Sequence, residues 1–100
     1  MESNEARAFT AMADPTRRAI LRVLGDQGEV AAGDIAREFP EMSRAAVSSH
    51  LRVLRSADMV QEKRRGQFRY YSLGSNRADE VIQFLMGVYS KDLDDFVGER

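Results

Sequence analysis

The chain has 100 residues, of which 43% are hydrophobic and 31% charged, a composition typical of folded globular domains rather than disordered chains. It contains no cysteine, which excludes disulfides, thiol catalysis and thiolate metal sites. No apolar run reaches the ~18 residues of a membrane span and no segment resembles a signal peptide, so we expect a single cytoplasmic domain over residues 1–100.

The net charge of −1 hides a segregation of charge along the chain. Residues 43–72 carry seven Lys and Arg against two Asp and Glu, so this segment is basic and the remainder is acidic. A compact basic patch on an acidic body attracts phosphate groups locally, because exposed charges are screened beyond about 10 Å at physiological salt. An ordinary solvated face has the same composition, so the positions of the charges have to decide.

The first predicted helix spans residues 4–13 and has an apolar stripe that needs a packing partner. The residues of this stripe are Ala6, Phe9, Met12 and Ala13. A second helix is expected to begin with Asp14 as N-cap and Pro15 in its first turn, and to end at Gly25. Its side chains expected in the core are Ile20, Val23 and Leu24.

A third helix is predicted over residues 30–39, and Pro40 ends it because proline cannot continue the hydrogen-bond ladder. Its expected core residues are Ile35, Ala36 and Phe39. After a turn at residues 40–42, Ser43 is a favourable N-cap for a fourth helix over residues 43–57. The buried stripe of this helix consists of Val47, Leu51 and Leu54.

The polar face of helix 43–57 carries small residues and arginines where solvated helices usually carry long Glu and Lys side chains. The residues of this face are Arg44, Ala45, Ser48, Ser49, Arg52 and Arg55. Short side chains between cations let the helix backbone approach another surface closely. Between the two faces, His50 is expected to be a half-buried structural residue, because Ser49 and His50 point about 100° apart and cannot pair as nucleophile and base.

The pattern then changes to that of a hairpin, with Gly66 at the tip of the basic stretch KRRGQ, residues 63–67. The flanking β-formers are Val60, Phe68, Tyr70, Tyr71 and Leu73. A last helix is predicted over residues 77–97, capped by Ser75 or Asn76. Its apolar stripe, which lacks a partner within the chain, consists of Ala78, Ile82, Leu85, Tyr89, Leu93 and Phe96.

These elements predict a mainly α fold with a small β-hairpin, arranged as a winged helix-turn-helix in the order α-α-α-α-β-β-α. The second helix of such a motif enters a DNA major groove about 12 Å wide, and the hairpin, residues 61–69, acts as a wing. The candidate DNA-contacting residues are Ser43, Arg44, Ala45, Ser48, Ser49, Arg52, Lys63, Arg64, Arg65 and Gln67. Small residues pack on base edges, Arg44 or Arg52 can bind guanine, and the wing cations reach phosphates or the minor groove.

In order and over about residues 8–75, the chain resembles the ArsR-type winged helix-turn-helix repressors of bacteria. The motifs that carry the resemblance are ADPTRRAILRVL, DIAREF, MSRAAVSSHLRVLRSADMV and GQFRYYSL. The resemblance implies a homodimer, paired through its first and last helices (residues 4–13 and 77–97), that represses its own or neighbouring operons from an inverted-repeat operator. The corresponding interface residues here are Phe9, Met12, Ile82, Leu85, Tyr89 and Leu93.

The chain departs from the metal-sensing members of that family. Those members carry cysteines at positions that correspond to Ala31 and Gly33. Others hold zinc-type ions between their last helices through histidine and carboxylates, but helix 77–97 contains no histidine, and carboxylates alone select these ions poorly. We therefore expect no metal cofactor. The turn at residues 40–42 is also one residue longer than the common form, which affects the angle expected for the recognition helix.

Two functions from different classes remain. The favoured one is a homodimeric DNA-binding repressor or autorepressor, and the alternative is a winged-helix protein-interaction module that docks through Phe96 and Val97. DNA affinity that falls steeply with salt separates the two, because counterion release marks phosphate contacts. An enzyme is disfavoured, since the sequence has no glycine-rich phosphate loop or metal-ligand cluster. An inducer lodged between the paired helices stays open beside a simple packed interface.

Overall fold

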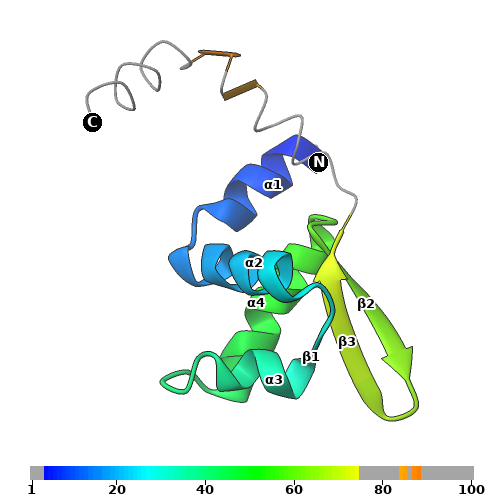
Figure 1. The fold of residues 1–100 in the computed structure, drawn as a ribbon. Helices are drawn as coiled ribbons and strands as arrows, with labels where there is room; N and C mark the ends of the chain where they lie inside the picture. Colours follow the sequence, from blue (N-terminus) through cyan, green and yellow to red (C-terminus); the bar gives the residue numbers. More distant parts are fainter. Residues whose placement is uncertain (1–3, 75–83, 86, 89–100) are drawn as a thin grey trace.

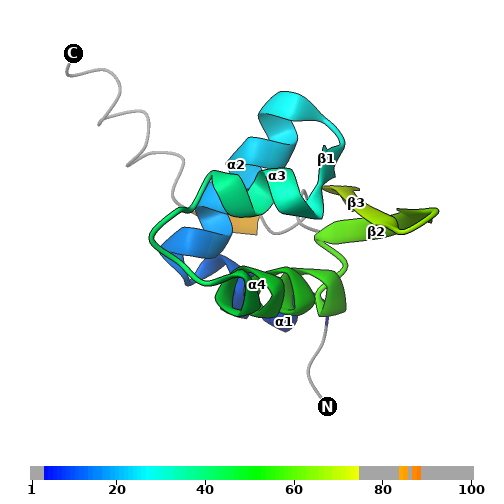
Figure 2. The ribbon, with the colours of Figure 1, turned by 90° about the horizontal axis from the view of Figure 1, so that it is seen from below.

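The computed structural model describes residues 4–74, 84, 85, 87 and 88. Its elements are α1 (Asn4–Met12), α2 (Pro15–Gln27), β1 (Val30–Ala31), α3 (Ala32–Arg37), α4 (Arg44–Ser56), β2 (Val60–Arg65) and β3 (Phe68–Leu73). Figure 1 shows helices α1 to α4 gathered together, with the β2–β3 hairpin extending beside them. Seen from below in Figure 2, α3 and α4 lie next to each other and the hairpin projects to one side. The predicted winged helix-turn-helix fold is confirmed.

The apolar stripes of the helices and strands meet in one core. Its buried side chains are Ala8, Ala11, Ile20, Leu24, Val30, Ile35, Val47, Leu51, Leu54, Ala57, Met59, Val60 and Tyr71. Full burial of a Leu or Ile side chain contributes about 1.5–3 kcal/mol, so this cluster supplies the main stabilising term of the domain. The inward stripes predicted for the second, third and fourth helices are confirmed by these residues and by the partly buried Val23 and Phe39, except that Ala36 is only partly buried and is not part of this core.

In α1 the residues that face the core differ from the predicted stripe. Ala8 and Ala11 are fully buried, whereas Phe9 stays 43% exposed and Met12 is partly buried. Alanine side chains let α1 lie close to α2 and α4, which a phenylalanine in the same place would prevent. The helix also ends at Met12, one residue earlier than predicted.

Arg17 ties α1 to α2 and α4 through its guanidinium group. Its Nε donates to the carbonyl oxygen of Ala11 at 2.7 Å, and its Nη2 donates to that of Thr10 at 3.1 Å. Its Nη1 lies 3.3 Å from Nδ1 of His50 on α4. His50 is half-buried, as predicted, and takes part in packing the helices together.

The predicted end of the second helix at Gly25 is wrong. The N-terminal signals are confirmed, since Asp14 caps the helix and Pro15 begins it, but α2 continues to Gln27. Gly28 then ends it with a φ of +85°, and its N–H donates to the carbonyl of Leu24 at 2.8 Å. A glycine inside a helix costs only about 1 kcal/mol, so Gly25 does not stop the helix.

Residues 30 and 31 form strand β1 rather than the first turn of the third helix. Val30 pairs with Tyr71 and Ala31 pairs with Tyr70, both in antiparallel register with β3. Val30 is buried by this pairing. A β-branched residue favours a strand, but the partner strand lies far along the chain, so a local helical pattern predicted the wrong element. The sheet has the strand order β1-β3-β2.

The third helix also ends before the predicted proline boundary. α3 stops at Arg37, and the N–H of Phe39 donates to a carbonyl three residues back. The residue that precedes a proline disfavours the helical backbone, so Phe39 does not extend α3, which ends two residues earlier than predicted. The connection to α4 therefore covers residues 38–43 instead of a tight turn at residues 40–42.

The wing is a regular hairpin whose tip is shorter than predicted. Its register runs from Val60 opposite Leu73 to Arg65 opposite Phe68. Gly66 has a φ of +63°, as its predicted place at the tip requires. The predicted tip cations Lys63, Arg64 and Arg65 lie within β2, and only Gly66 and Gln67 form the turn.

A close approach of backbone closes the base of the hairpin. The N–H of Gly74 donates to the carbonyl oxygen of Met59 at 2.8 Å. A Cβ atom on Gly74 would overlap the carbonyl oxygen of Asp58, which itself has a φ of +58° as the chain leaves α4. Only glycine fits here, and this contact fixes where the two strands start relative to α4.

Most of the predicted last helix, residues 77–97, lies outside the described residues. The same holds for its expected caps, Ser75 and Asn76, and for three predicted interface residues, Ile82, Tyr89 and Leu93. Leu85 packs partly buried against the core. Phe84 and Val88, one helical turn apart, are 64% and 57% exposed. None of the described helices is long and apolar enough to span a membrane.

The close approach at Gly74 predicts an unequal response of two glycines to alanine. Gly74→Ala should lower the free energy of unfolding by about 1–3 kcal/mol, because the new methyl group overlaps backbone that cannot move aside. Gly33→Ala is the matched control, since nothing lies within 4 Å of its Cβ position. Urea unfolding measures both. Equal stability of the two variants would contradict the packing described for the hairpin base.

Candidate nucleic-acid interface

The helix α4 is held by one face and by its N-terminal cap. Val47, Leu51 and Leu54 are at most 3% exposed. Ser43 caps the helix, because its Oγ accepts a hydrogen bond from the N–H of Ala46 at 3.0 Å. Both features are as predicted, and they fix the helix without using its opposite face.

All the residues predicted for the outward face of α4 are exposed, namely Arg44, Ala45, Ser48, Ser49, Arg52 and Arg55, and so is the N-cap Ser43. Arg44 and Arg52 take part in none of the ion pairs formed within residues 4–74. The face therefore offers two guanidinium groups that have no counter-ion within residues 4–74, with short side chains between them. Such a surface can approach a polyanion closely and pair with it.

The register of the hairpin divides its side chains between two faces. Residues directly opposite in an antiparallel pair lie on the same face, and the pairs include Glu62 with Tyr71 and Arg64 with Arg69. Tyr71 is buried against the helices, so this is the inner face of the hairpin. Lys63 lies on the outer face because side chains alternate along a strand.

Arg65 also lies on the outer face, where its guanidinium group contacts Glu29 and the ring of Tyr70. Its Nη1 and Nη2 donate to the two carboxylate oxygens of Glu29 at 2.6 and 3.1 Å, and its guanidinium lies 5.0 Å from the ring centre of Tyr70. These hydrogen bonds and the charge of Glu29 raise the pKa of Arg65 further. Lys63, Arg64 and Gln67 are exposed, and within the described residues no ion pair involves Lys63 or Arg64.

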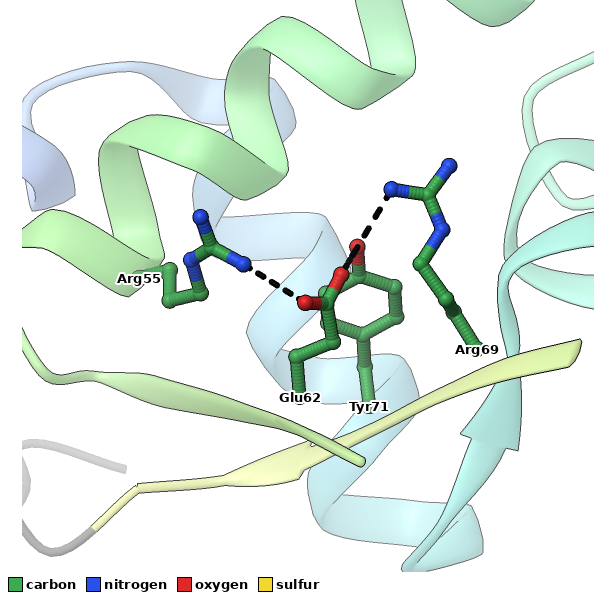
Figure 3. Close-up of polar contacts among 4 residues, drawn as sticks. All are labelled: Arg55, Glu62, Arg69 and Tyr71. Carbon is green, nitrogen blue, oxygen red and sulfur yellow. Dashed lines mark hydrogen bonds and ion pairs between the residues drawn. The ribbon is translucent and has the colours of Figure 1, made fainter. Parts of the chain in front are cut away.

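Glu62 joins α4 to the inner face of the hairpin, as Figure 3 shows. One carboxylate oxygen accepts a hydrogen bond from Arg55 of α4 at 2.6 Å, and the other accepts one from the Tyr71 hydroxyl at 2.7 Å. Nη1 of Arg69 lies 3.6 Å from that second oxygen. The hydrogen bond from Tyr71, and then the charges of Arg55 and Arg69, outweigh burial and hold the pKa of Glu62 below its ordinary value. The carboxylate is therefore ionised at neutral pH.

Glu62 and Arg69 are not among the site residues predicted from the sequence. Their roles depend on the register of the hairpin and on the place of α4 beside it. Part of the signal was nevertheless local, because a tight turn at Gly66 and Gln67 sets residue 62 opposite residue 71 and residue 64 opposite residue 69. The contact with Arg55 required the tertiary structure.

Two hollows lie between α4 and the inner face of the hairpin. One, of about 230 Å³, is lined by Arg44 of α4, by Arg69 of β3 and by the start of α3. The other, of about 180 Å³, is lined by Arg52, Glu62 and their neighbours. Ser48 and Arg69 line both hollows, so the exposed face of α4 and the inner face of the hairpin form one continuous cationic surface.

The described residues place no group of three or more His, Cys, Asp or Glu side chains where they would hold a metal ion. Ala31 and Gly33, the two positions considered for metal sensing in the sequence, lie in β1 and α3. The electrostatic character of the site comes from its arginines.

Known proteins are similar to this chain in sequence and in fold. Residues 12–62 match the family model of a helix-turn-helix domain. Over 83 residues, the chain is 40% identical to the transcriptional repressor SdpR of Bacillus subtilis, which covers 83% of this chain and 90% of that protein.

Solved structures agree with that relationship. The crystal structure of a possible transcriptional regulator for arsenical resistance is 34% identical, with a TM-score of 0.73 over 91% of this chain and 93% of the other. An ArsR family transcriptional regulator, RHA00566, shares the fold at 24% identity, with a TM-score of 0.76 over 91% of this chain and 96% of the other. With its exposed basic helix beside a β-hairpin, the chain belongs to the ArsR-type winged helix-turn-helix family of DNA-binding transcriptional regulators.

Proposed function

We propose that this protein is a homodimeric repressor, or an autorepressor, that binds an inverted-repeat operator in the cytoplasm. In this proposal α4 lies in the major groove, and the wing contacts phosphates or the adjacent minor groove. The observation that carries it is the outward face of α4, where every predicted contact residue is exposed and Arg44 and Arg52 have no ion-pair partner within residues 4–74. The relative SdpR, named as a transcriptional repressor, supports the direction of regulation.

The side chains of α4 suit direct reading of bases. Arg44 or Arg52 can donate two hydrogen bonds to the O6 and N7 atoms of guanine, the contact that gives most base discrimination. The hydroxyls of Ser48 and Ser49 can pair with several bases, and the Ala45 methyl can pack on the methyl group of thymine. Because these side chains are short, the helix backbone can sit deep in the groove.

An inverted repeat needs two recognition helices about 34 Å apart, which a twofold dimer provides. The proposed interface contains the residues predicted from the sequence on the first and last helices. The described part of the chain supports it, since Phe9, Phe84 and Val88 leave large apolar side chains exposed in the single chain. A second copy would cover them. Met12 and Leu85 lie partly buried beside the core.

The first prediction concerns base recognition by α4. Arg44→Ala and Arg52→Ala should each weaken binding to the operator by about 1–3 kcal/mol, because each removes a charge-assisted contact with DNA. Gel shifts with the DNA upstream of the protein's own gene measure the loss, and circular dichroism checks the fold. Arg22→Ala, an exposed change of equal charge on α2, is the control. Undiminished binding by the double variant would contradict the assignment of α4.

The second prediction concerns the wing. Lys63→Gln and Arg64→Gln should each lower the slope of log affinity against log salt by about 0.9, as expected for one lost phosphate contact. Arg65→Gln should change the slope less, because Glu29 already neutralises that guanidinium. Titrations at several salt concentrations provide the slopes. A shallow slope for the unmodified protein would favour the protein-interaction alternative.

The third prediction concerns the dimer. Phe9→Glu combined with Phe84→Glu should give a monomer in sedimentation, because two charges enter an apolar interface. Operator affinity should fall on the order of 100-fold or more, since the half-sites are then bound independently. Phe68→Glu, at an exposed phenylalanine of the wing, is the matched control and should leave the protein dimeric. A dimeric double variant would refute the proposed interface.

A further inference from the structure

The hollow of about 230 Å³ at the start of α4 has cations from two elements, and no carboxylate is among the described residues that line it. Arg44 comes from the first turn of α4 and Arg69 comes from β3. The exposed residue Ser48 adds a hydroxyl group, and part of the remaining lining is apolar, including Val47 and Leu51. The hollow thus presents hydrogen-bond donors and positive charge, with no counter-ion inside it.

Arg69 retains most of its hydrogen-bonding capacity. Its one ion pair within the described residues is with Glu62, at 3.6 Å, and its side chain is 50% exposed. A guanidinium group has five N–H donors, so the remainder can bind an anion. Arg64 lies directly across from Arg69 on the inner face of the hairpin. Like charges at opposed positions are unfavourable, and an anion bound beside them would relieve this repulsion.

We propose that this hollow seats one phosphodiester of the operator, contacted by Arg69, Arg44 and the hydroxyl of Ser48. The inference rests on the DNA binding proposed above and adds a contact residue and its place on the DNA. The sugar-phosphate backbone of one DNA strand separates the major groove from the adjacent minor groove. With α4 in the major groove and the hairpin at the minor groove, this backbone passes between α4 and the hairpin. Two non-bridging oxygens can accept hydrogen bonds from two guanidinium groups at once.

Glu62 is the positioning residue of this seat. Its carboxylate lies between Arg69 on one side and Arg55 on the other, as Figure 3 shows, and accepts a hydrogen bond from the Tyr71 hydroxyl. Its side chain is only 17% exposed, so little of its negative charge is accessible to cations in the solvent. Glu62 orients the arginines without contacting DNA.

The test neutralises one phosphate at a time. Duplexes that the protein selects from a random library are synthesised with a single methylphosphonate, which is uncharged, and the Kd is measured by fluorescence anisotropy. For the unmodified protein, one position should weaken binding on the order of 10-fold, as expected for the loss of a charge-assisted contact. For Arg69→Gln and for Arg44→Gln, binding to the unmodified duplex should be weaker, and methylphosphonate at that same position should cause no further loss.

Arg22→Gln on α2 is the matched control and should keep the full penalty at that position. The seat is overturned if the Arg69 and Arg44 variants keep the penalty at every phosphate, or lose it at different phosphates, although the protein still binds DNA. If the unmodified protein binds no duplex at all, the proposed function fails together with the seat. Both arginines are exposed, so the variants should fold, and thermal unfolding verifies this.

The role of Glu62 has a separate readout. Glu62→Gln makes the protein more cationic, so charge alone predicts tighter binding to every duplex. The amide oxygen still accepts the hydrogen bond from Tyr71, but Arg69 loses its ionic partner. If Glu62 positions Arg69, methylphosphonate at the seat should weaken binding by the Glu62→Gln variant less than it weakens binding by the unmodified protein. An unchanged penalty with tighter overall binding would show that Glu62 does not position Arg69.

Discussion

The arrangement of the surface proposed to bind DNA depends on one carboxylate set between α4 and the hairpin. Glu62 accepts hydrogen bonds from Arg55 and Tyr71 and lies beside Arg69. Arg55 and Arg69 are about half exposed, so each of these ion pairs contributes at most ~1 kcal/mol to stability. The bond from the buried Tyr71 hydroxyl is charge-assisted and stronger. The cluster therefore acts mainly on geometry: it sets the angle of the wing against the recognition helix.

The stability of α4 comes from its packing in the core and from its N-terminal cap. Its outward face is therefore free for binding. The inner face of the helix packs in the core through Leu51, Leu54 and Val47, and the cap at Ser43 completes its first turn. Serines inside a helix cost about 0.5 kcal/mol each relative to alanine, a small term beside the burial of three large side chains. The two serines of the binding face are thus tolerated because the opposite face holds the helix in place.

The hairpin places the cations of the basic segment on two faces with different partners, which a count of charges does not reveal. Arg64 and Arg69 share the inner face with Glu62, next to α4, whereas Arg65 on the outer face is paired with Glu29. Cations of one short segment therefore differ in their freedom to meet a phosphate. The surface proposed for DNA is the outward face of α4 together with the inner face of the hairpin and the exposed Lys63, and the acidic remainder of the chain limits indiscriminate binding.

The sequence by itself determined the features that depend on neighbours within a few residues: the cap of α2, the cap and two faces of α4, and the glycine at the hairpin tip. Each follows from local backbone geometry or helical spacing. The tertiary structure decided the rest. Val30 became a strand because β3 pairs with it, alanines rather than Phe9 pack α1, and Glu62 gained its partner Arg55 on α4. Contacts between segments far apart in the chain leave no periodic signal, since they depend on how finished elements pack together.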